Sequence, residues 1–591
     1  MIKHTLLTAL TTILAEMGLT DSMPAVDYPT DPAHGDYASN IALVAAKKLG
    51  KNPRDLAEEI AKKLTDALPD LIAKTEVAGP GFINVWIKDD ALMGTLNVQT
   101  MSSLLAGKKM VVEYTDPNPF KEFHIGHLYS NIVGESVARL LQACGATVWK
   151  ADYFGDVGMH VSKAIWGLLG KFEKEQLTID AINDWDLTKK INYFGQAYAA
   201  GATAYEEDAS AKEDMKELNF LIFKAAQEVV LQQFKEKPQI DYERFIKSGK
   251  YDYEQIKHIY ELGREWSLAY FELIYKRLGT KFDGYYPESR TGEYGYQMVM
   301  DGLAKGVFEK GDGGAIIFPG SKHGLHERVF INSLGLPTYE TKDFGNAVAK
   351  SVDFPYDQSL VVTGNEINDY FQVIIKALSL LNPQLGEKTI HLGHGMVRLP
   401  EGKMSSRTGK IKTGESLLDE AHSRAKAIAE DSNDDLAEMI GQAAIKYALL
   451  KQGIGRDVIF NFEESISFEG NSGPYLQYTY VRTRSVLKRA ENGELRAENG
   501  ELRIEKEERA LLRLLARYPE IVEDAAIRYA PNVLCTYLFE LAQAFNGFYQ
   551  KHQIVKAPEE SRAFRISLTS SVGKTLQSGL LLLGIKAPEK M

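Results

Sequence analysis

The sequence predicts a chain of several domains, in which an α/β domain built on a parallel sheet is preceded by a small α+β unit and followed by an all-helical unit. A length of 591 residues is too great for a single hydrophobic core. Residues 108–151 read as strand, tight loop, long helix and strand, whereas the chain from about residue 441 onward shows helical periodicity. These observations predict an α/β domain in the middle of the chain and a helical domain at its end.

The βαβ unit starts with a β-branched segment at residues 110–114. Residues 116–119, DPNP, must end that strand, because neither proline has a backbone N–H to donate. From His127, apolar residues recur with a helical period, and Gly145 stands where a C-terminal cap glycine belongs before a second strand at residues 147–153. We expect a right-handed crossover and a parallel sheet.

The flanking segments follow the same logic. Strand-like runs return at residues 314–318, 328–331 and 358–363, and we expect them to complete the sheet. Residues 166–284 are helical and charged, which indicates an insertion into the α/β domain. Residues 1–105 begin with helical segments and close on a strand-rich stretch, so they should form the α+β unit.

The loop after the first strand carries Lys121, His124, Gly126 and His127. It lies between the carboxyl end of a strand and the amino end of a helix, where free N–H groups and the helix dipole attract anions. Two imidazoles add hydrogen-bond donors there, and Gly126 allows a ligand to approach the backbone. The alternative is a surface loop with two incidental histidines.

A second loop, EGKMSSRTGK at residues 401–410, is small, polar and cationic. Taken together, HIGH at residues 124–127 and KMSSR at residues 403–407 resemble the HIGH and KMSKS signatures of class I aminoacyl-tRNA synthetases, with Ser406 in place of the second lysine. The resemblance implies a Rossmann-type parallel sheet in the catalytic domain. Flexible glycines at Gly402 and Gly409 would let the second loop close over ATP.

Other stretches resemble the arginyl-tRNA synthetases in particular. Residues 31–38 and 79–87 are similar to their N-terminal domain, and residues 467–478 and 583–588 to their helical anticodon-binding domain. The resemblance implies an N-terminal tRNA-binding domain at 1–105, a catalytic domain at 106–440 and an anticodon-binding domain at 441–591. The insertion at 166–284 looks too small and too helical for an editing domain.

The resemblance also implies roles for individual residues. The catalytic residues would be His124, His127, Lys403 and Lys121, and the ATP-binding residues His124, Gly126, His127, Lys403, Met404 and Ser405. Arginine would be bound by Glu113, Asn118, His124, Tyr339 and Asp343, with Tyr339 and Asp343 forming a Y-x-x-x-D signature and Glu288 as a weaker candidate. The sequence departs from the family at Ile367, where a glutamine is usual, and at Val157 and His160.

A basic segment near the end is the candidate tRNA-binding face. Residues 471–490 include no acidic residue and carry Arg482, Arg484 and Lys488 among tyrosines, a composition suited to phosphates and stacked bases. The alternative is an ordinary helix with a buried stripe of Leu476, Tyr480 and Leu487 and a solvated basic side.

Composition sets the remaining expectations. A net charge of −11 argues mildly against nucleic-acid binding. Such binding depends on the local electrostatic field, however, so a basic face on an acidic protein is sufficient. Two cysteines are too few for a disulfide framework or a thiolate zinc site, and no apolar run approaches a membrane span, so we expect a cytoplasmic protein. His391 and His394 lack a third ligand, so we expect no protein-held metal.

The sequence therefore predicts an arginine–tRNA ligase. The resemblance implies that it uses ATP with Mg²⁺, L-arginine and tRNA(Arg), and that it acts as a monomer. Two alternatives stay open. One is another class I synthetase, or a tRNA-free ATP-dependent amino-acid ligase on the same fold. The other is a catalytically silent tRNA-binding relative. The tandem AENGELR copies at residues 490–503 should form an exposed loop extension.

Overall fold

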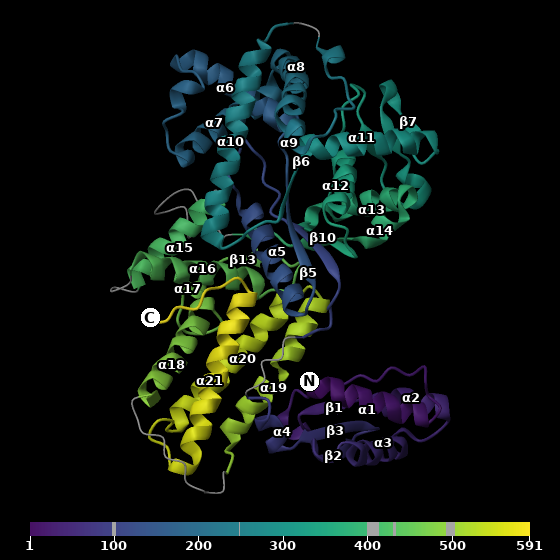
Figure 1. The fold of residues 1–591 in the computed structure, drawn as a ribbon, viewed down its shortest axis with the longest axis vertical. Coiled ribbons are helices and arrows are strands. Elements are labelled where there is room, and N and C mark those ends of the chain that lie inside the picture. The colour runs from purple at the N-terminus through teal and green to yellow at the C-terminus, as the bar shows by residue number, and fades with distance from the viewer. Residues whose placement is uncertain (97–101, 247–248, 399–412, 429–432, 492–502) are drawn as a thin grey trace. The chain divides into compact units, whose positions relative to one another are not determined.

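The computed structural model describes residues 1–96, 102–246, 249–398, 413–428, 433–491 and 503–591 (Figure 1). Contacts divide the chain into two compact units. One comprises Met1–Leu104 together with Ser467–Met591, and the other comprises Leu105–Ile466. The N-terminal α+β region and the C-terminal helices therefore share a unit, and the α/β domain forms the other.

A five-stranded parallel sheet confirms the predicted α/β domain. Its strands lie in the order β11, β10, β4, β5, β6, with bounds β4 (Lys109–Tyr114), β5 (Thr147–Phe154), β6 (Gly284–Pro287), β10 (Gln358–Gly364) and β11 (Thr389–His394). The chain builds outward from β4 in one direction through β5 and β6, and in the other through β10 and β11. The order thus reverses between β4 and β10, and open sheets of this kind bind ligands at that point.

Helix α5 (Ile125–Ala143) connects β4 to β5, as the βαβ prediction requires. It lies so close to β4 that a Cβ atom on Gly134 would come within 2.2 Å of the Tyr114 ring. Gly145 follows the helix with φ of 94°, a left-handed conformation that explains the glycine at this end. The tight packing of α5 fixes the loop that precedes it.

The strand runs at residues 314–318 and 328–331 do not join the parallel sheet, so that expectation was wrong. They form a separate antiparallel sheet of β7 (Glu309–Lys310), β8 (Ile316–Phe318) and β9 (Arg328–Ile331). Parallel neighbours need a crossover of about a dozen residues or more, usually a helix. The short link between β8 and β9 permits only an antiparallel return.

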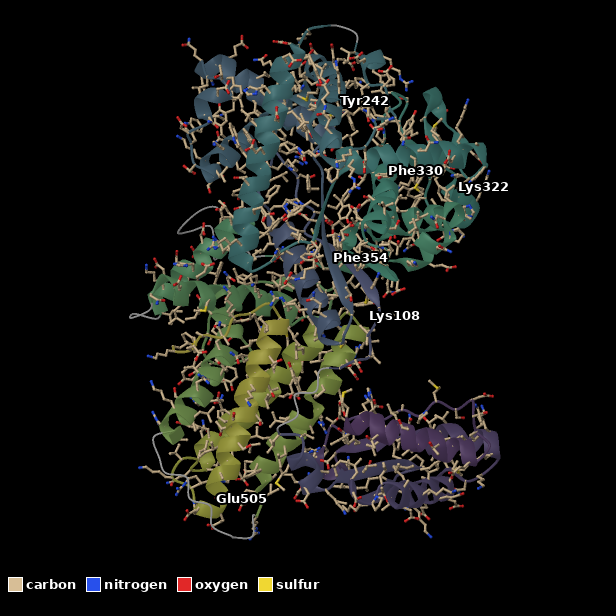
Figure 2. All side chains as sticks on the ribbon, in the orientation of Figure 1. Lys108, Tyr242, Lys322, Phe330, Phe354 and Glu505 are labelled. Atoms are coloured by element: carbon tan, nitrogen blue, oxygen red, sulfur yellow. The ribbon has the colours of Figure 1, made fainter. Side chains whose placement is uncertain are left out.

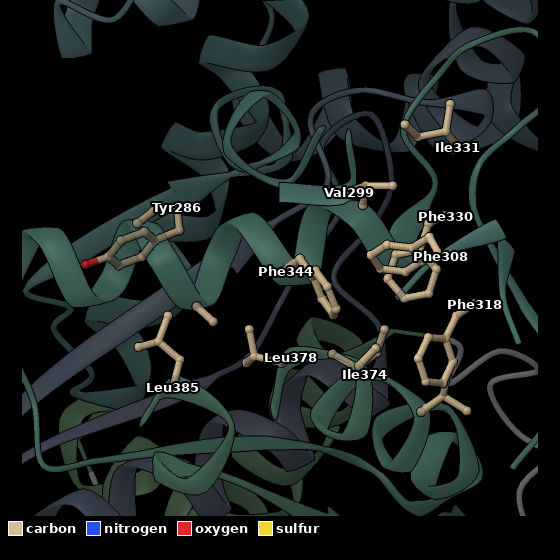
Figure 3. Packing of buried hydrophobic residues seen from close by; sticks show 14 of the residues in the cluster. Tyr286, Val299, Phe308, Phe318, Phe330, Ile331, Phe344, Ile374, Leu378 and Leu385 are labelled. Carbon is tan, nitrogen blue, oxygen red and sulfur yellow. The ribbon is translucent and has the colours of Figure 1, made fainter. Parts of the chain in front are cut away.

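This small sheet packs with four helices into one hydrophobic cluster (Figure 3). The helices are α11 (Glu288–Ala304), α12 (Tyr339–Asp353), α13 (Asn368–Leu381) and α14 (Pro383–Lys388). Phe344 of α12 is fully buried between Phe308 and Phe330, with ring centroids 6.1 and 4.9 Å away. Where α11 and α12 cross, a Cβ atom on Gly345 would lie 1.7 Å from the Thr291 carbonyl oxygen, so only glycine fits. The cluster holds α12 rigidly beside the sheet.

The predicted insertion is helical, and the described residues between 166 and 283 form no strand. Its elements are α6 (Met159–Glu175), α7 (Leu187–Glu207), α8 (Ala209–Ala226), a π-helical turn (Gln227–Leu231), α9 (Gln232–Phe234) and α10 (Tyr253–Leu278). The same unit ends with α15 (Gly414–Ile428), α16 (Asp434–Leu450), α17 (Phe462–Ser465) and the paired strands β12 (Val397–Arg398) and β13 (Val458–Ile459). Aromatic packing is extensive in this unit: Trp149 stacks on Phe354, with ring centroids 5.3 Å apart. Phe354 is labelled in Figure 2.

The other unit confirms the α+β and all-helical predictions for the two ends of the chain. Its N-terminal part packs α1 (Ile2–Glu16), α2 (Ile41–Leu49), α3 (Pro53–Ala67) and α4 (Asp89–Met93) with an antiparallel sheet of β1 (Tyr37–Ser39), β3 (Phe82–Ile87) and β2 (Ile72–Ala78). Its C-terminal part consists of α18 (Gly473–Glu491), α19 (Lys506–Ile527), α20 (Pro531–Lys551) and α21 (Glu559–Leu582). No described helix is long and apolar enough to span a membrane.

A buried carboxylate on α19 joins the two parts of this unit. Glu520 accepts hydrogen bonds from the Tyr28 hydroxyl at 2.5 Å, the Lys3 backbone N–H at 2.7 Å and the Tyr37 hydroxyl at 3.2 Å. Nearby, Asp36 pairs with Arg509 at 3.0 Å. These contacts tie the N-terminal domain to α19 through groups that are largely removed from water, where hydrogen bonds are hard to replace.

We predict that Glu520→Ala loosens the N-terminal domain from α19, because the substitution leaves the donors of Lys3, Tyr28 and Tyr37 without their acceptor. Each buried donor left unpaired costs about 1–3 kcal/mol. Limited proteolysis should then release the N-terminal domain faster from the variant than from the wild type.

The matched control for this prediction is Asp524→Ala, which removes an acidic side chain from the same helix. The Asp524 carboxylate is partly exposed and pairs with Arg528, so it takes no part in the Glu520 contacts. This variant should be cleaved at the wild-type rate. Equal cleavage of Glu520→Ala and the wild type would contradict the prediction.

Candidate active site

A cavity of about 700 Å³ opens at the carboxyl ends of the parallel strands. Its wall is formed by the loop after β4, the start of α5, the ends of β10 and β11, and residues of α12 and α13. The cavity therefore lies at the point where the strand order reverses. Most predicted site residues in the described part of the chain line it: Glu113, Asn118, His124, Gly126, His127, Glu288, Tyr339 and Asp343.

The two histidines of the HIGH sequence cap helix α5 together. The His124 Nδ1 accepts the His127 backbone N–H at 3.4 Å, and the His127 Nδ1 accepts the His124 backbone N–H at 3.3 Å. Their rings stack with centroids 3.4 Å apart. A Cβ atom on Gly126 would come within 3.0 Å of the His124 ring, so the glycine permits this stacking.

Both histidines are neutral at physiological pH. Desolvation, followed by the positive charge of Lys121, lowers the pKa of His124 to about 4, and burial holds the pKa of His127 well below its usual value. Because each Nδ1 accepts a backbone N–H, each ring proton resides on Nε2. The pair thus offers two neutral N–H donors at a helix amino terminus, a combination suited to phosphate oxygens.

The loop between β4 and α5 is conformationally strained. Thr115, Asp116 and Phe120 have φ values of 90°, 51° and 65°, in a region that residues with a side chain seldom occupy. Lys121, predicted to be catalytic, does not line the cavity; its ammonium lies 4.2 Å from the centroid of the Tyr198 ring of α7. Lys121 nevertheless contributes to the low pKa values of both histidines.

Tyr339 and Asp343 lie one turn apart on α12, and both line the cavity. The Tyr370 hydroxyl donates to the Asp343 carboxylate at 2.5 Å. Burial, with smaller contributions from the carboxylates of Glu113 and Glu288, raises the pKa of Asp343 to about 7. An uncharged or half-charged carboxyl group in this position favours a cationic ligand, which would restore the charged form.

The other predicted acidic residues are already paired. Glu113 forms an ion pair with Lys350 and accepts a hydrogen bond from Asn346 at 2.9 Å. Glu288 forms an ion pair with Lys342 at 2.5 Å. Both lysines belong to α12, so they orient the two carboxylates and link this helix to the sheet side of the cavity.

The sequence analysis missed these lysines and several further residues of the cavity wall. Lys342, Asn346 and Lys350 follow one another at four-residue intervals on a buried helix, a polar stripe that would have been the available signal. The additional lining residues include Asp116, Tyr153, Arg328, Glu366 and His394. They come from separate elements, so sequence spacing does not bring them together.

The structure also places the residues that depart from the family. Ile367 lines the cavity and offers no polar side-chain group there. Val157 is buried, and its carbonyl oxygen accepts a hydrogen bond from Lys342 at 3.2 Å. His160 is buried with a pKa lowered to about 3 by desolvation, and its Nε2 donates to the Gly155 carbonyl at 2.7 Å.

Lys403, Met404, Ser405 and Ser406 of the cationic loop lie outside the described residues. The chain that follows the loop does contact the HIGH segment. Thr413 bridges to His124, and the Gly414 backbone N–H donates to the Phe123 carbonyl at 2.7 Å. Thr413 and Gly414, which follow the loop in the chain, therefore lie beside the HIGH segment.

The candidate tRNA-binding residues lie on α18. Leu476 and Tyr480 are buried while Arg484 and Lys488 are exposed, so the helix has both the apolar stripe and the basic side. Arg482 is engaged within the domain, donating to the Tyr478 hydroxyl at 3.2 Å, and Arg484 pairs with Glu589 at 3.1 Å. Both AENGELR copies lie almost entirely outside the described residues.

His391 and His394 each have a hydrogen-bond partner within the catalytic unit. The His391 Nε2 lies 2.7 Å from the Thr363 hydroxyl oxygen, and the His394 Nδ1 donates to the Gly395 carbonyl at 2.8 Å. Within the described part of the chain, no group of three or more His, Cys, Asp or Glu side chains is arranged to hold a metal ion.

Comparison with known proteins gives consistent matches along the chain. Three family models match: the arginyl-tRNA synthetase N-terminal domain at residues 1–87, the catalytic domain of class I (R) tRNA synthetases at residues 92–462, and the DALR anticodon-binding domain at residues 476–591. The chain is 31% identical to an arginine–tRNA ligase of Flavobacterium psychrophilum, covering 91% of this chain and 90% of the relative.

It is also 30% identical to an arginine–tRNA ligase of Bacteroides thetaiotaomicron, covering 94% of each. Among solved structures, an arginyl-tRNA synthetase of Thermus thermophilus matches with a TM-score of 0.78 and 25% identity over 100% of both chains. That of Plasmodium falciparum has a similar fold, with a TM-score of 0.75 and 20% identity over 100% of this chain and 99% of the other.

We predict that Asp343→Asn stabilises the ligand-free protein at pH 8. A carboxyl group whose pKa is about 7 in the folded state and about 3.9 in the unfolded chain lowers stability as pH rises between these values, because the folded state binds more protons. Asparagine removes this penalty and can still accept the Tyr370 hydrogen bond. Thermal unfolding should show a higher Tm for the variant at pH 8 and no difference at pH 4; a lower Tm at pH 8 would contradict the prediction.

Proposed function

Because the chain belongs to the arginyl-tRNA synthetases of class I, it is an arginine–tRNA ligase, and we propose that the cavity between β4 and β10 is where L-arginine reacts with ATP. The single observation that supports this site best is the HIGH pair, whose two neutral N–H donors line the cavity at the amino end of α5. The arginyl-adenylate formed there passes its arginyl group to the 3′ end of tRNA(Arg), releasing AMP.

The first step needs positioning rather than a base. The carboxylate of arginine is already an anion, and it attacks the α-phosphorus of ATP while pyrophosphate departs. Catalysis then depends on holding the two anions together and on stabilising the charge that develops on the phosphate oxygens. His124 and His127 donate to those oxygens from Nε2, and their low pKa values keep them in this neutral donor form.

Lys403 supplies the positive charge that the neutral histidines do not. Thr413, which follows the cationic loop in the chain, is bridged to His124, and this contact supports the proposed action of Lys403 on the same phosphates. Mg²⁺ would enter with ATP and be held mainly by the phosphates, as is usual for this ion, with Glu366 as an exposed cavity carboxylate available to it. Bound there, the ion would neutralise the departing pyrophosphate.

Arginine lies with its side chain toward α12 in this proposal. Asp343 accepts from the guanidinium group and Tyr339 covers its plane, a contact that planar cations make with aromatic rings. Asn118 contributes an amide to the same wall. Glu113 also contributes to arginine binding in this proposal, with Glu288 as a weaker candidate; in each carboxylate, Oε2 is held by a lysine of α12.

The tRNA is bound by both ends of the chain in this proposal. The domain at residues 1–105 contacts the elbow of the tRNA, the helical domain contacts the anticodon stem, and the catalytic domain at 106–440 receives the acceptor end. The anticodon-binding model at residues 476–591 supports the second of these assignments. We also propose that the enzyme acts as a monomer in the cytoplasm, where translation takes place.

Amino-acid-dependent ATP–pyrophosphate exchange tests the proposed site and substrate. The pure full-length protein should be incubated with ATP, Mg²⁺, labelled pyrophosphate and tRNA, and each of the twenty amino acids should be tested separately. Exchange is expected with arginine and not with the others, because the cavity carries carboxyl groups suited to a guanidinium ion. Exchange with another amino acid, but not with arginine, would contradict the proposed substrate.

Two variants test the proposed roles in the same assay. His127→Ala and Lys403→Ala should each lower kcat by roughly 100-fold or more, the size expected for losing one preorganised donor or charge. His258→Ala is the matched control, because this histidine is exposed and pairs with Asp180 outside the cavity. If either site variant keeps the wild-type kcat, that residue does not take part in the reaction.

Charge reversal on α18 should weaken tRNA binding without changing the reaction of arginine with ATP at saturating tRNA. In the double variant Arg484→Glu/Lys488→Glu, two exposed cations of the basic side become anions. Filter binding should show a weaker affinity and a shallower dependence on salt, since fewer counterions are released. Arg528→Glu reverses an exposed charge at the end of α19 and serves as the control. If the tRNA affinity of both variants depends on salt concentration to the same extent, tRNA does not bind this side of α18.

A further inference from the structure

A buried hydrogen bond joins helix α10 to the first turn of helix α15. Helix α10 belongs to the helical insertion and α15 follows the cationic loop; both are labelled in Figure 1. The Tyr270 hydroxyl of α10 donates to the Glu415 carboxylate of α15 at 2.7 Å. Tyr270 is 2% exposed and Glu415 is half-buried, so water competes little for this bond. The contact therefore gives the beginning of α15 a defined place against α10.

The residues around Glu415 form a turn that is held by its own hydrogen bonds. We call Thr413, Gly414, Glu415 and Ser416 the α15 start. The Thr413 backbone N–H donates to the Ser416 hydroxyl at 3.1 Å, and the Ser416 backbone N–H donates to the Thr413 hydroxyl at 3.1 Å. Reciprocal bonds of this kind stabilise the first turn of a helix. Because the turn is held internally, a contact that positions Glu415 also positions Thr413 and Gly414.

The α15 start packs against the HIGH segment. Thr413 is bridged to His124, and the Gly414 backbone N–H donates to the Phe123 carbonyl at 2.7 Å. A Cβ atom on Gly414 would lie 3.0 Å from the Phe123 ring and 3.2 Å from Leu128, so the two segments are in close contact. The placement of Phe123 and His124 therefore depends on that of the α15 start.

Phe123 in turn packs against the second histidine of HIGH. Its ring is fully buried, with its centroid 5.4 Å from that of His127 and 6.2 Å from that of Phe271, which follows Tyr270 on α10. The His127 ring stacks on His124 with centroids 3.4 Å apart. Helix α10 thus supports the two histidines by two routes, one through Phe271 and Phe123, and the other through the α15 start.

The Tyr270 hydroxyl keeps its proton at physiological pH, so it is a permanent donor. Burial, followed by the hydrogen bond to Glu415, raises the pKa of Tyr270 above its usual value. The backbone of Phe123 acts on the same hydroxyl in the opposite direction, lowering this pKa. The hydroxyl therefore lies where α10, the α15 start and the residue before HIGH come together.

We propose that Tyr270 is a positioning residue for the activation of arginine: its hydroxyl holds the α15 start, and through it the HIGH pair, so that the Nε2 donors of His124 and His127 meet the phosphates of ATP. The inference rests on the proposed binding of ATP by this pair. Tyr270 is not among the residues that line the cavity, so it acts through its neighbours. Small shifts matter here, because a misplacement of about 1 Å can lower a rate by about 100-fold.

The test compares Tyr270→Phe with the wild type in ATP–pyrophosphate exchange, using the full-length protein with arginine, Mg²⁺ and tRNA. Phenylalanine keeps the ring that packs beside Phe271 at 5.9 Å, so folding should be preserved. The kcat should fall roughly 10-fold, less than in His127→Ala, because both donors remain but lose their orientation. The KM values for arginine and ATP should stay within about twofold, because orientation matters most in the transition state.

Tyr193→Phe is the matched control within the helical insertion. Tyr193 of α7 is 7% exposed, and its hydroxyl donates to the Glu175 carboxylate at 3.1 Å. The variant therefore loses the same kind of buried bond, but neither residue is among those that line the cavity. It should keep the wild-type kcat. This comparison separates a general loosening of the insertion from the loss of a specific position.

A second variant removes the acceptor and keeps Tyr270. Glu415→Ala should lower kcat to the same extent as Tyr270→Phe, and the double variant should be no slower than either single variant, because all three lack one and the same hydrogen bond. Glu420→Ala is the control on α15, since this carboxylate pairs with Arg424 of the same helix at 2.6 Å. It should keep the wild-type kcat. This series tests the proposal even if Tyr270→Phe folds poorly.

Four outcomes would overturn the proposal. A wild-type kcat in Tyr270→Phe or Glu415→Ala would show that the bond does not position the site. Equal losses in Tyr270→Phe and Tyr193→Phe would show a general structural effect. A raised KM with unchanged kcat would show a role in binding the substrates. Independent, multiplying losses in the double variant would show that the two residues act separately. A wild-type kcat in His127→Ala would instead refute the proposed role of the HIGH pair, so the two failures are distinguishable.

Discussion

The ion pair between Lys350 and Glu113 is the interaction on which the arrangement of the catalytic unit depends. Both side chains are 2% exposed, and they join helix α12 to the central strand β4. Burying two charges is costly, and removing one partner of such a pair typically costs about 3–5 kcal/mol. Because each buried charge needs the other, the pair fixes how α12 faces the sheet. Lys342, earlier on the same helix, makes a similar contact with Glu288.

This placement gives the cavity wall two sets of groups with opposite character. The amino terminus of α5 and the neutral histidines offer donors to anions. Helix α12 brings Asp343 to the wall and holds Glu113 and Glu288 in pairs. A triphosphate and a cationic amino acid therefore have complementary surroundings within one cavity, and the reacting carboxylate lies between them in the proposed reaction.

The lysine pairs also explain why the acidic wall is not uniform. Carboxylates that share a small cavity repel one another, so most must be neutralised for the protein to fold. Glu113 and Glu288 are neutralised permanently by lysines of α12. Asp116 and Asp343 have no such lysine among the described residues, and Asp343 accepts a hydrogen bond from the Tyr370 hydroxyl instead. The different roles of these carboxyl groups are therefore set by the residues with which they interact.

The sequence by itself determined the βαβ unit, the helical insertion, the α+β region at the start of the chain and the helical region at its end. It also determined that HIGH lies where a strand is followed by a helix. These features follow from local periodicity, from prolines and glycines, and from short motifs whose geometry is local. Residues such as Tyr339 and Asp343 were likewise predictable, because one helical turn places them together. Only the tertiary structure decided the separate antiparallel sheet of β7, β8 and β9, the pairing of Glu113 with Lys350, and the contact of Tyr370 with Asp343. Those outcomes depend on contacts between segments distant along the chain, and no local pattern specifies them. Glu113 and Lys350, for example, are 237 positions apart.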